Sequence, residues 1–99
     1  MTIRVDPERN EISALKQIGP WRGKKVLEIG CGEGRLTLRL ARLGPELIQA
    51  IDPSVDLIRS AQKNLPERLA KHVHYQVGSA EDLKYPSNTF DIVVFSWVL

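Results

Sequence analysis

Three glycines spaced by two residues follow a short apolar run, and they form the strongest chemical signal in this chain. The run Val26–Ile29 leads into Gly30, Gly32 and Gly34, and Glu28 stands two residues before the first glycine. Glycines let a backbone turn sharply and approach a ligand closely. The start of the following helix offers unpaired N–H groups. The segment therefore predicts a ligand-binding turn between a strand and a helix.

Asp52 is the second signal, because it stands 20 residues after Gly32 at the end of another apolar run. An acid at that place and spacing can accept hydrogen bonds from ribose hydroxyls. A dinucleotide fingerprint would read Gly-x-Gly-x-x-Gly. Here the third glycine comes one residue early, and Arg35 stands where the last glycine is expected. Glu28 also suits a positively charged ligand better than a diphosphate, so both departures argue against a dinucleotide.

Hydrophobic periodicity places these residues at the ends of strands. The predicted strands cover residues 25–29, 47–51, 73–77 and 90–98. The predicted helices cover residues 6–18, 35–43 and 55–65, with Ser54 as the N-cap of the last. Strands that alternate with helices imply right-handed crossovers and a parallel sheet. Ligands of such sheets bind beyond the carboxyl ends of the strands, where the glycines and Asp52 fall.

Four segments together resemble the N-terminal, cofactor-binding portion of the class I S-adenosylmethionine-dependent methyltransferases. These segments are Glu28–Gly34, Ala50–Ser54, Gly78–Leu83 and Asn88–Val94. The small-molecule methyltransferases, which include the ubiquinone and sterol enzymes, resemble the chain most. The resemblance implies a Rossmann-like three-layer α/β/α fold with a parallel sheet, present in part as four strands in the order 3-2-1-4. It also implies S-adenosylmethionine as cofactor and S-adenosylhomocysteine as its product.

The same resemblance implies which residues meet the methionine part of the cofactor. Glu28 would face the methionine ammonium, directly or through water. Gly30, Cys31 and Gly32 would lie against the methionine chain. Ser96, at the end of the fourth strand, would approach the methionine end.

A second group of residues would meet the adenosine part. Asp52 would hold both ribose hydroxyls, with Pro53 against the adenine ring. The backbone of Ala80 and Glu81 would meet the adenine edge. Ser79 departs from the acid or amide that is common at its position. Its hydroxyl can still accept a hydrogen bond from the adenine amino group, although we expect a weaker contact.

Simpler interpretations of several residues stay open at this point. Glu28 could be a solvated carboxylate at a strand end, and Asp52 could cap the helix that follows it. Cys31 could be no more than a residue small enough for the turn, since no paired histidine and acid accompany it. His72 and His74 could be metal ligands, but no third ligand is evident and no metal site is expected. The sequence does not identify a catalytic residue.

Composition places limits on the class of protein. The chain has 99 residues, of which 42% are hydrophobic and 26% charged, which suits one globular domain over residues 1–99. The net charge of +2 is spread along the chain, so no nucleic acid partner is expected. The single cysteine suits a reducing cytosol. No apolar run reaches the roughly 20 residues that a membrane span needs, and a cytoplasmic location is expected.

The expected function is an S-adenosylmethionine-dependent methyltransferase that transfers a methyl group to a small-molecule acceptor. The alternative is a non-catalytic module that binds S-adenosylmethionine and lacks the acceptor site, because the chain is expected to be truncated after its fourth strand. That strand would then lie at an open edge of the sheet. Residues 92–99 are nearly all apolar, and a bare apolar edge invites pairing with another chain. A homo-oligomer through this edge is therefore predicted.

Overall fold

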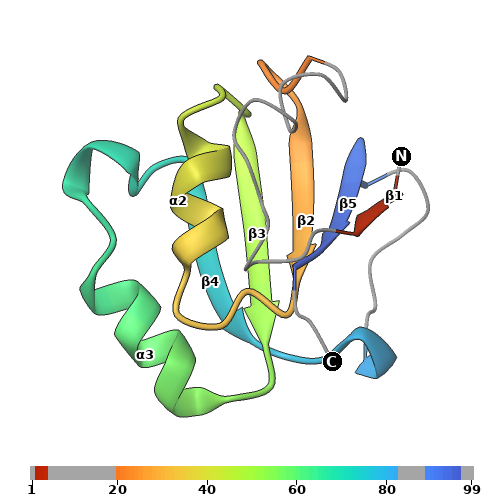
Figure 1. The fold of residues 1–99 in the computed structure, drawn as a ribbon. Helices are drawn as coiled ribbons and strands as arrows, with labels where there is room; N and C mark the ends of the chain where they lie inside the picture. Colours follow the sequence, from red (N-terminus) through yellow and green to blue (C-terminus); the bar gives the residue numbers. More distant parts are fainter. Residues whose placement is uncertain (1, 5–19, 83–88, 97–99) are drawn as a thin grey trace.

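The computed structural model describes residues 2–4, 20–82 and 89–96. Its strands form one five-stranded parallel sheet in the order β1-β5-β2-β3-β4 (Figure 1). The strands are β1 Thr2–Arg4, β2 Lys25–Ile29, β3 Leu47–Asp52, β4 Val73–Val77 and β5 Ile92–Phe95. The helices are α2 Arg35–Ala41 and α3 Val55–Lys63, with short 3-10 turns η1 Glu67–Leu69 and η2 Ala80–Asp82.

The predicted arrangement of four strands is confirmed. The predicted order 3-2-1-4 is the observed run β4-β3-β2-β5. β2 and β4 have the predicted bounds, and β3 extends one residue further, to Asp52. The helix predicted over residues 6–18 lies outside the described residues, as do residues 97 and 98 of the predicted fourth strand. Within the described residues that strand is shorter than predicted, since β5 covers Ile92–Phe95 and not residues 90–98.

The prediction that the fourth strand forms an open edge is wrong. β1 pairs in parallel with β5, and Thr2, Ile3 and Arg4 stand opposite residues 93–95. β5 therefore has a neighbouring strand on each side, since β2 pairs with its other edge. Three residues are too few to show a strand periodicity, so no pattern in the sequence indicates β1. The self-association predicted through a bare β5 edge loses its basis.

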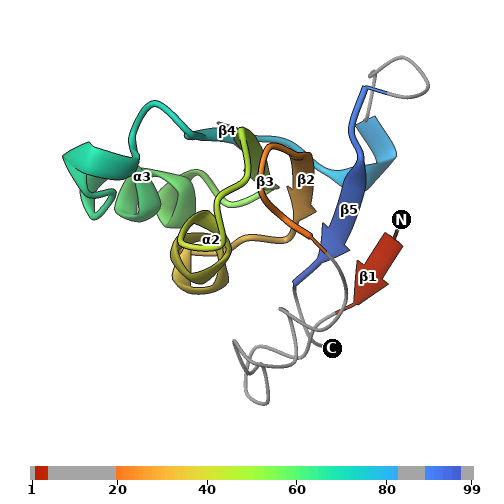
Figure 2. The same cartoon turned by 90° about the horizontal axis from the view of Figure 1, so that it is seen from above.

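Both faces of the sheet bury apolar side chains, which explains the nearly continuous apolar runs of the strands. Figure 2 shows α2 and α3 on the same side of the sheet. On that side, Leu36 and Leu40 of α2 and Ile58 of α3 belong to the larger core cluster. The opposite face carries a smaller cluster built on Leu27, Ile29 and Ile51, with Phe90, Val93 and Phe95 packed against it.

Local capping positions α3 at the end of β3. The hydroxyl of Ser54 accepts a hydrogen bond from the N–H of Leu57 at 3.2 Å, so the predicted N-cap is confirmed. Asp56 lies in the first turn and Lys63 in the last, where their charges suit the helix dipole. None of the helices in the described residues has both the length and the apolar character that crossing a membrane requires.

Candidate functional site

The glycine turn begins where β2 ends, and hydrogen bonds fasten it to the neighbouring strand. The N–H groups of Gly30 and Cys31 both donate to the carbonyl oxygen of Ile51 in β3, at 2.8 and 3.0 Å. The N–H of Gly34 then donates back to the carbonyl of Cys31 at 3.0 Å. These hydrogen bonds within the protein hold the turn in a defined shape at the carboxyl edge of the sheet.

Gly34 shows why the last position of this turn requires glycine. It is the N-cap of α2 and has φ of 90°, a conformation that side chains rarely adopt. A Cβ atom built there would overlap the hydroxyl oxygen of Tyr75, which comes from β4. The close approach of α2 to the sheet thus depends on the absence of a side chain at Gly34.

Asp52 joins the glycine turn to the start of α3. Its Oδ2 accepts a hydrogen bond from the N–H of Gly32, and its Oδ1 accepts one from the N–H of Ser54, both at 2.9 Å. The side chain is 8% exposed. A carboxylate has about four lone-pair positions, so two accepted bonds leave capacity for a ligand. Ser54 caps α3, and the open alternative that Asp52 serves as that cap is therefore excluded.

A first hollow, of about 310 Å³, lies beside Asp52 at the carboxyl edge of the sheet. Its walls come from the ends of β2 and β3 and from the segment after β4, and its lining residues are Ile29, Gly30, Asp52, Pro53, Gly78, Ser79, Ala80 and Glu81. All five residues predicted to meet the adenosine part line this one space. The N–H of Gly78 donates to the backbone carbonyl of Asp52 at 3.0 Å, which fixes this segment against β3.

A second hollow, of about 330 Å³, lies on the other side of Gly30, which lines both spaces. Its lining residues are Gly30, Cys31, Gly32, Glu33, Arg35, Leu36, Leu57 and Ser96. Four of the five residues predicted to meet the methionine part are among them. The other four lining residues were not predicted: Glu33 belongs to the glycine turn, Arg35 and Leu36 begin α2, and Leu57 lies in the first turn of α3.

Ser96 ties β5 to the glycine turn across 66 residues of sequence. Its hydroxyl donates to the carbonyl of Gly30 at 3.0 Å, and its N–H donates to the carbonyl of Ile29 at 3.0 Å. The residue is buried. The hydrogen bonds of Ser96 thus run to protein atoms of the glycine turn, and its approach to the methionine end of a cofactor stays a prediction.

Glu28 lines neither hollow. Its side chain is fully buried, and the hydroxyl of Thr37 in α2 donates to its Oε1. Within the described residues, Oε2 has no hydrogen-bond partner. Burial raises the pKa of this carboxyl, the hydroxyls of Thr37 and Ser96 oppose that shift, and the charge of Asp52 adds to it. The alternative of a solvated strand-end carboxylate is excluded.

Cys31 is buried and lacks the setting of a nucleophile. Burial raises the pKa of its thiol, and the negative charges of Glu28 and Asp52 raise it further. Because the thiolate is the nucleophilic form, a raised pKa makes this thiol a poorer nucleophile. The structure favours the simple interpretation that Cys31 is small enough for the turn.

The two histidines are engaged with β3 and the loop before it. Nδ1 of His72 lies 3.0 Å from the carbonyl oxygen of Glu46, and Nδ1 of His74 lies 2.8 Å from Oε1 of Gln49. Over residues 2–4, 20–82 and 89–96, no three His, Cys, Asp or Glu side chains gather as metal ligands would.

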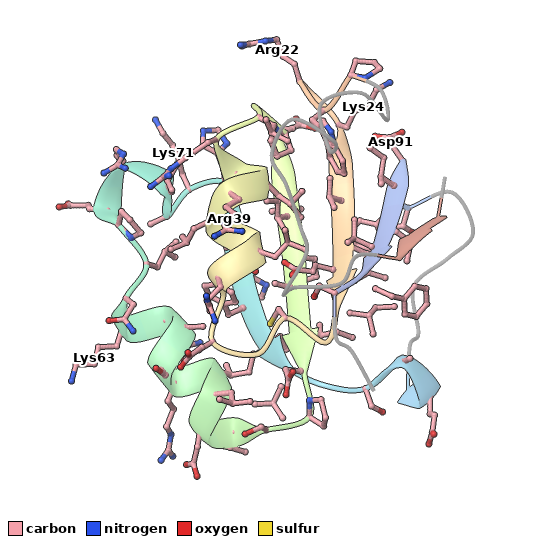
Figure 3. All side chains as sticks on the ribbon, in the orientation of Figure 1. Arg22, Lys24, Arg39, Lys63, Lys71 and Asp91 are labelled. Atoms are coloured by element: carbon pink, nitrogen blue, oxygen red, sulfur yellow. The ribbon has the colours of Figure 1, made fainter. Side chains whose placement is uncertain are left out.

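Basic side chains gather away from the hollows. In Figure 3, Arg22, Lys24 and Lys71 lie toward the amino-terminal end of the strands, while the hollows lie at the carboxyl ends. Among the described residues that line the two hollows, Arg35 is the only cation.

A parallel sheet with a glycine turn after its central strand and an acid after the next defines a Rossmann-like α/β domain. The methyltransferase domain family matches residues 26–99. The chain belongs to this family, and the resemblance that the motifs indicated is confirmed.

Individual relatives agree with this assignment. The chain is 42% identical over 83 residues to the human mitochondrial ubiquinone biosynthesis O-methyltransferase, covering 81% of this chain and 22% of that protein. It is 33% identical over 98 residues to the ribosomal protein arginine N-methyltransferase rmt3 of Schizosaccharomyces pombe, covering 98% of this chain and 18% of that protein. The chain thus spans about a fifth of the length of these curated relatives.

A solved structure shows the same fold. The phosphoethanolamine N-methyltransferase 1 of Haemonchus contortus, in complex with phosphoethanolamine and S-adenosylhomocysteine, superposes with a TM-score of 0.71 at 28% identity. The match covers 86% of this chain and 18% of that one.

Proposed function

We propose that this chain binds S-adenosylmethionine at the carboxyl edge of its sheet and takes part in transferring the methyl group to a small-molecule acceptor. One observation carries the proposal. Asp52 lines one hollow and is hydrogen-bonded to Gly32 of the other, while Gly30 lines both. A ligand with a ribose flanked by a base and an amino-acid chain matches this arrangement of a carboxylate between two spaces.

The first hollow is proposed to hold the adenosine part. Asp52 accepts the ribose hydroxyls with the lone pairs that Gly32 and Ser54 leave free. Pro53 offers an apolar surface to the adenine ring, and the backbone of Ala80 and Glu81 lies on the same wall. Support comes from the shared lining of these residues.

The second hollow is proposed to hold the methionine part. Gly30 and Gly32 leave the backbone bare for close approach, and Cys31 and Ser96 line the same space. Glu28 lies beneath this turn in the core, so it acts on a ligand through the position of the turn rather than by direct contact.

When bound, S-adenosylmethionine would supply a methyl group that its positively charged sulfur makes electrophilic. The protein's part is to orient the reactants and to keep the site dry. A base is needed only where the acceptor must also lose a proton. Cys31 is unsuited to that role because burial raises the pKa of its thiol.

The acceptor class follows from similarity. We propose a small molecule because the human relative with 42% identity is named for ubiquinone biosynthesis. We further propose that residues 1–99 form a single cofactor-binding domain. We also propose a cytoplasmic location, because a single cysteine suits a reducing compartment.

Calorimetric titration of the purified chain with S-adenosylmethionine and S-adenosylhomocysteine tests the proposal, with NAD as the control. Binding of the first two and not of NAD supports it. A folded chain that binds neither, or that binds NAD as well as it binds them, contradicts it.

A second candidate is a binding module that holds the cofactor without turnover. The observation that favours it is that no histidine, the commonest general base, is among the described residues that line the two hollows. Binding of S-adenosylhomocysteine without methyl transfer to phenolic acceptors would favour this candidate over the enzyme.

A further inference from the structure

One acidic and one basic residue line the second hollow. Glu33 and Arg35 both line it, and they flank Gly34 in sequence. Both side chains are exposed. Within the described residues, neither side chain makes a hydrogen bond or ion pair, so both charges are available to a ligand.

No other charged residue of the described chain lines this hollow. Cys31, Leu36, Leu57 and Ser96 complete the lining together with glycines. Glu28 is enclosed behind Thr37 and does not reach the space. Asp52 lines the first hollow, with its Oδ2 directed to the N–H of Gly32. Among the described residues, the opposite charges that line the second hollow therefore come from Glu33 and Arg35.

We propose that Glu33 and Arg35 form a recognition pair for a zwitterionic amino-acid group, with Glu33 taking the ammonium and Arg35 the carboxylate. This inference rests on the proposed function, because it identifies that group with the methionine end of the cofactor. The planar guanidinium suits a carboxylate, with which it can form two parallel hydrogen bonds. The role that the motifs assigned to Glu28 then passes to Glu33, because Glu33 lies at the surface of the hollow.

The proposal has a consequence for the class of reaction. Decarboxylated S-adenosylmethionine, the donor of aminopropyl groups, keeps the ammonium and lacks the carboxylate. A site that uses Arg35 to bind the carboxylate selects against this ligand. Arg35 would thus be a specificity-determining residue that directs the site toward methyl donation.

Calorimetry with three ligands tests the pair: S-adenosylmethionine, decarboxylated S-adenosylmethionine and 5′-methylthioadenosine, which lacks the whole amino-acid group. Arg35→Ala should weaken binding of S-adenosylmethionine by about tenfold, the scale of one charge-assisted hydrogen bond. It should leave the other two ligands within about twofold of the parent, which is near the scatter between related variants. Glu33→Ala should weaken the two ammonium-bearing ligands and spare 5′-methylthioadenosine.

Arg42→Ala is the matched control, since it removes the same charge from the C-cap at the far end of α2. It should change none of the three affinities. Equal loss of all three ligands in Arg35→Ala, or no loss of any, overturns the recognition pair while the proposed function stands. If the parent chain binds none of the three, the proposed function fails and the pair falls with it.

Discussion

The carboxylate of Asp52 accepts a hydrogen bond from the N–H of Gly32, with 2.9 Å between Oδ2 and N. Asp52 ends β3 and Gly32 lies in the turn after β2, so the bond joins the ends of two neighbouring strands. The other carboxylate oxygen accepts from Ser54 at the start of α3. One side chain thus holds three backbone segments together at the edge where the two hollows lie.

Asp52→Ala should therefore reduce both ligand affinity and stability. We expect S-adenosylmethionine binding to weaken by about 1–3 kcal/mol, the scale for losing hydrogen bonds to a charged group. The melting temperature should also fall, because two backbone N–H groups lose their acceptor. Calorimetry and thermal denaturation measure the two effects. Asp56→Ala removes an exposed carboxylate from the first turn of α3 and serves as the control; equal affinities in both variants would count against the site.

Alanine substitutions at Gly34 and Gly32 separate two costs to stability: overlap with a neighbouring side chain and backbone strain. Both have positive φ, but a Cβ at Gly32 meets no atom within 4 Å, whereas at Gly34 it overlaps the hydroxyl of Tyr75. Gly32→Ala should lower the free energy of unfolding by about 1–2 kcal/mol from strain alone. Gly34→Ala should cost about 1–3 kcal/mol more from overpacking.

Urea denaturation of both variants measures the difference between them. Adding Tyr75→Phe to Gly34→Ala should recover part of that difference, since the overlapping oxygen is removed. The Tyr75 hydroxyl makes no hydrogen bond within the described residues, so the single Tyr75→Phe change should cost little. Equal costs for the two alanine variants would refute the overlap.

Glu28 should make stability depend on pH in a characteristic direction. Burial raises the pKa of its carboxyl above the ordinary value of 4.5, so the folded chain holds this proton at pH values where the unfolded chain has released it. Stability contributed by this group is complete below pH 4.5 and is lost as the pH rises through the folded pKa. Glu28→Gln keeps the shape and the bond from Thr37 but cannot ionise.

The stability difference between Glu28→Gln and the parent should therefore move in favour of the variant as the pH rises from 4 to 8. Thermal denaturation across this range measures it. Glu67→Gln, at an exposed position in η1, should show no comparable trend. A difference that stays constant across the range, or that moves toward the parent, would contradict a buried neutral carboxyl.

β1 should protect the edge of β5 from other chains. Deletion of residues 1–4 removes the strand opposite residues 93–95 and leaves their backbone groups unpaired. We expect the truncated chain to self-associate at concentrations where the parent does not. Light scattering after gel filtration measures the mass of each, and Ile3→Val, which keeps the backbone pairing, is the control. The same mass for truncated and parent chains would show that β1 does not guard this edge.

The sequence by itself determined the parallel sheet, the glycine turn, and the positions of Asp52 and Ser54. These features depend on local patterns: apolar runs of strand length, glycines at fixed spacing, and an N-cap before an amphipathic segment. Alternation with helices then restricts the strand order to few possibilities. For this reason β2 and β4 have the predicted bounds and all the residues predicted for the adenosine side share one hollow.

Only the tertiary structure decided which groups reach a ligand and which are enclosed. Glu28 stands at the spacing of a ligand-binding acid, yet its carboxyl is buried in the core. The reason is that α2 packs on this face of the sheet, where the hydroxyl of Thr37 donates a hydrogen bond to Oε1 of Glu28. In the sequence, Arg35 only marked a departure from the dinucleotide fingerprint, because it stands where the last glycine is expected. In the structure it lines a hollow together with Ser96, which is 61 positions away in the sequence. β1 pairs with β5 although the two strands lie near opposite ends of the sequence. Such contacts arise from packing between distant elements, and a local pattern carries no information about them.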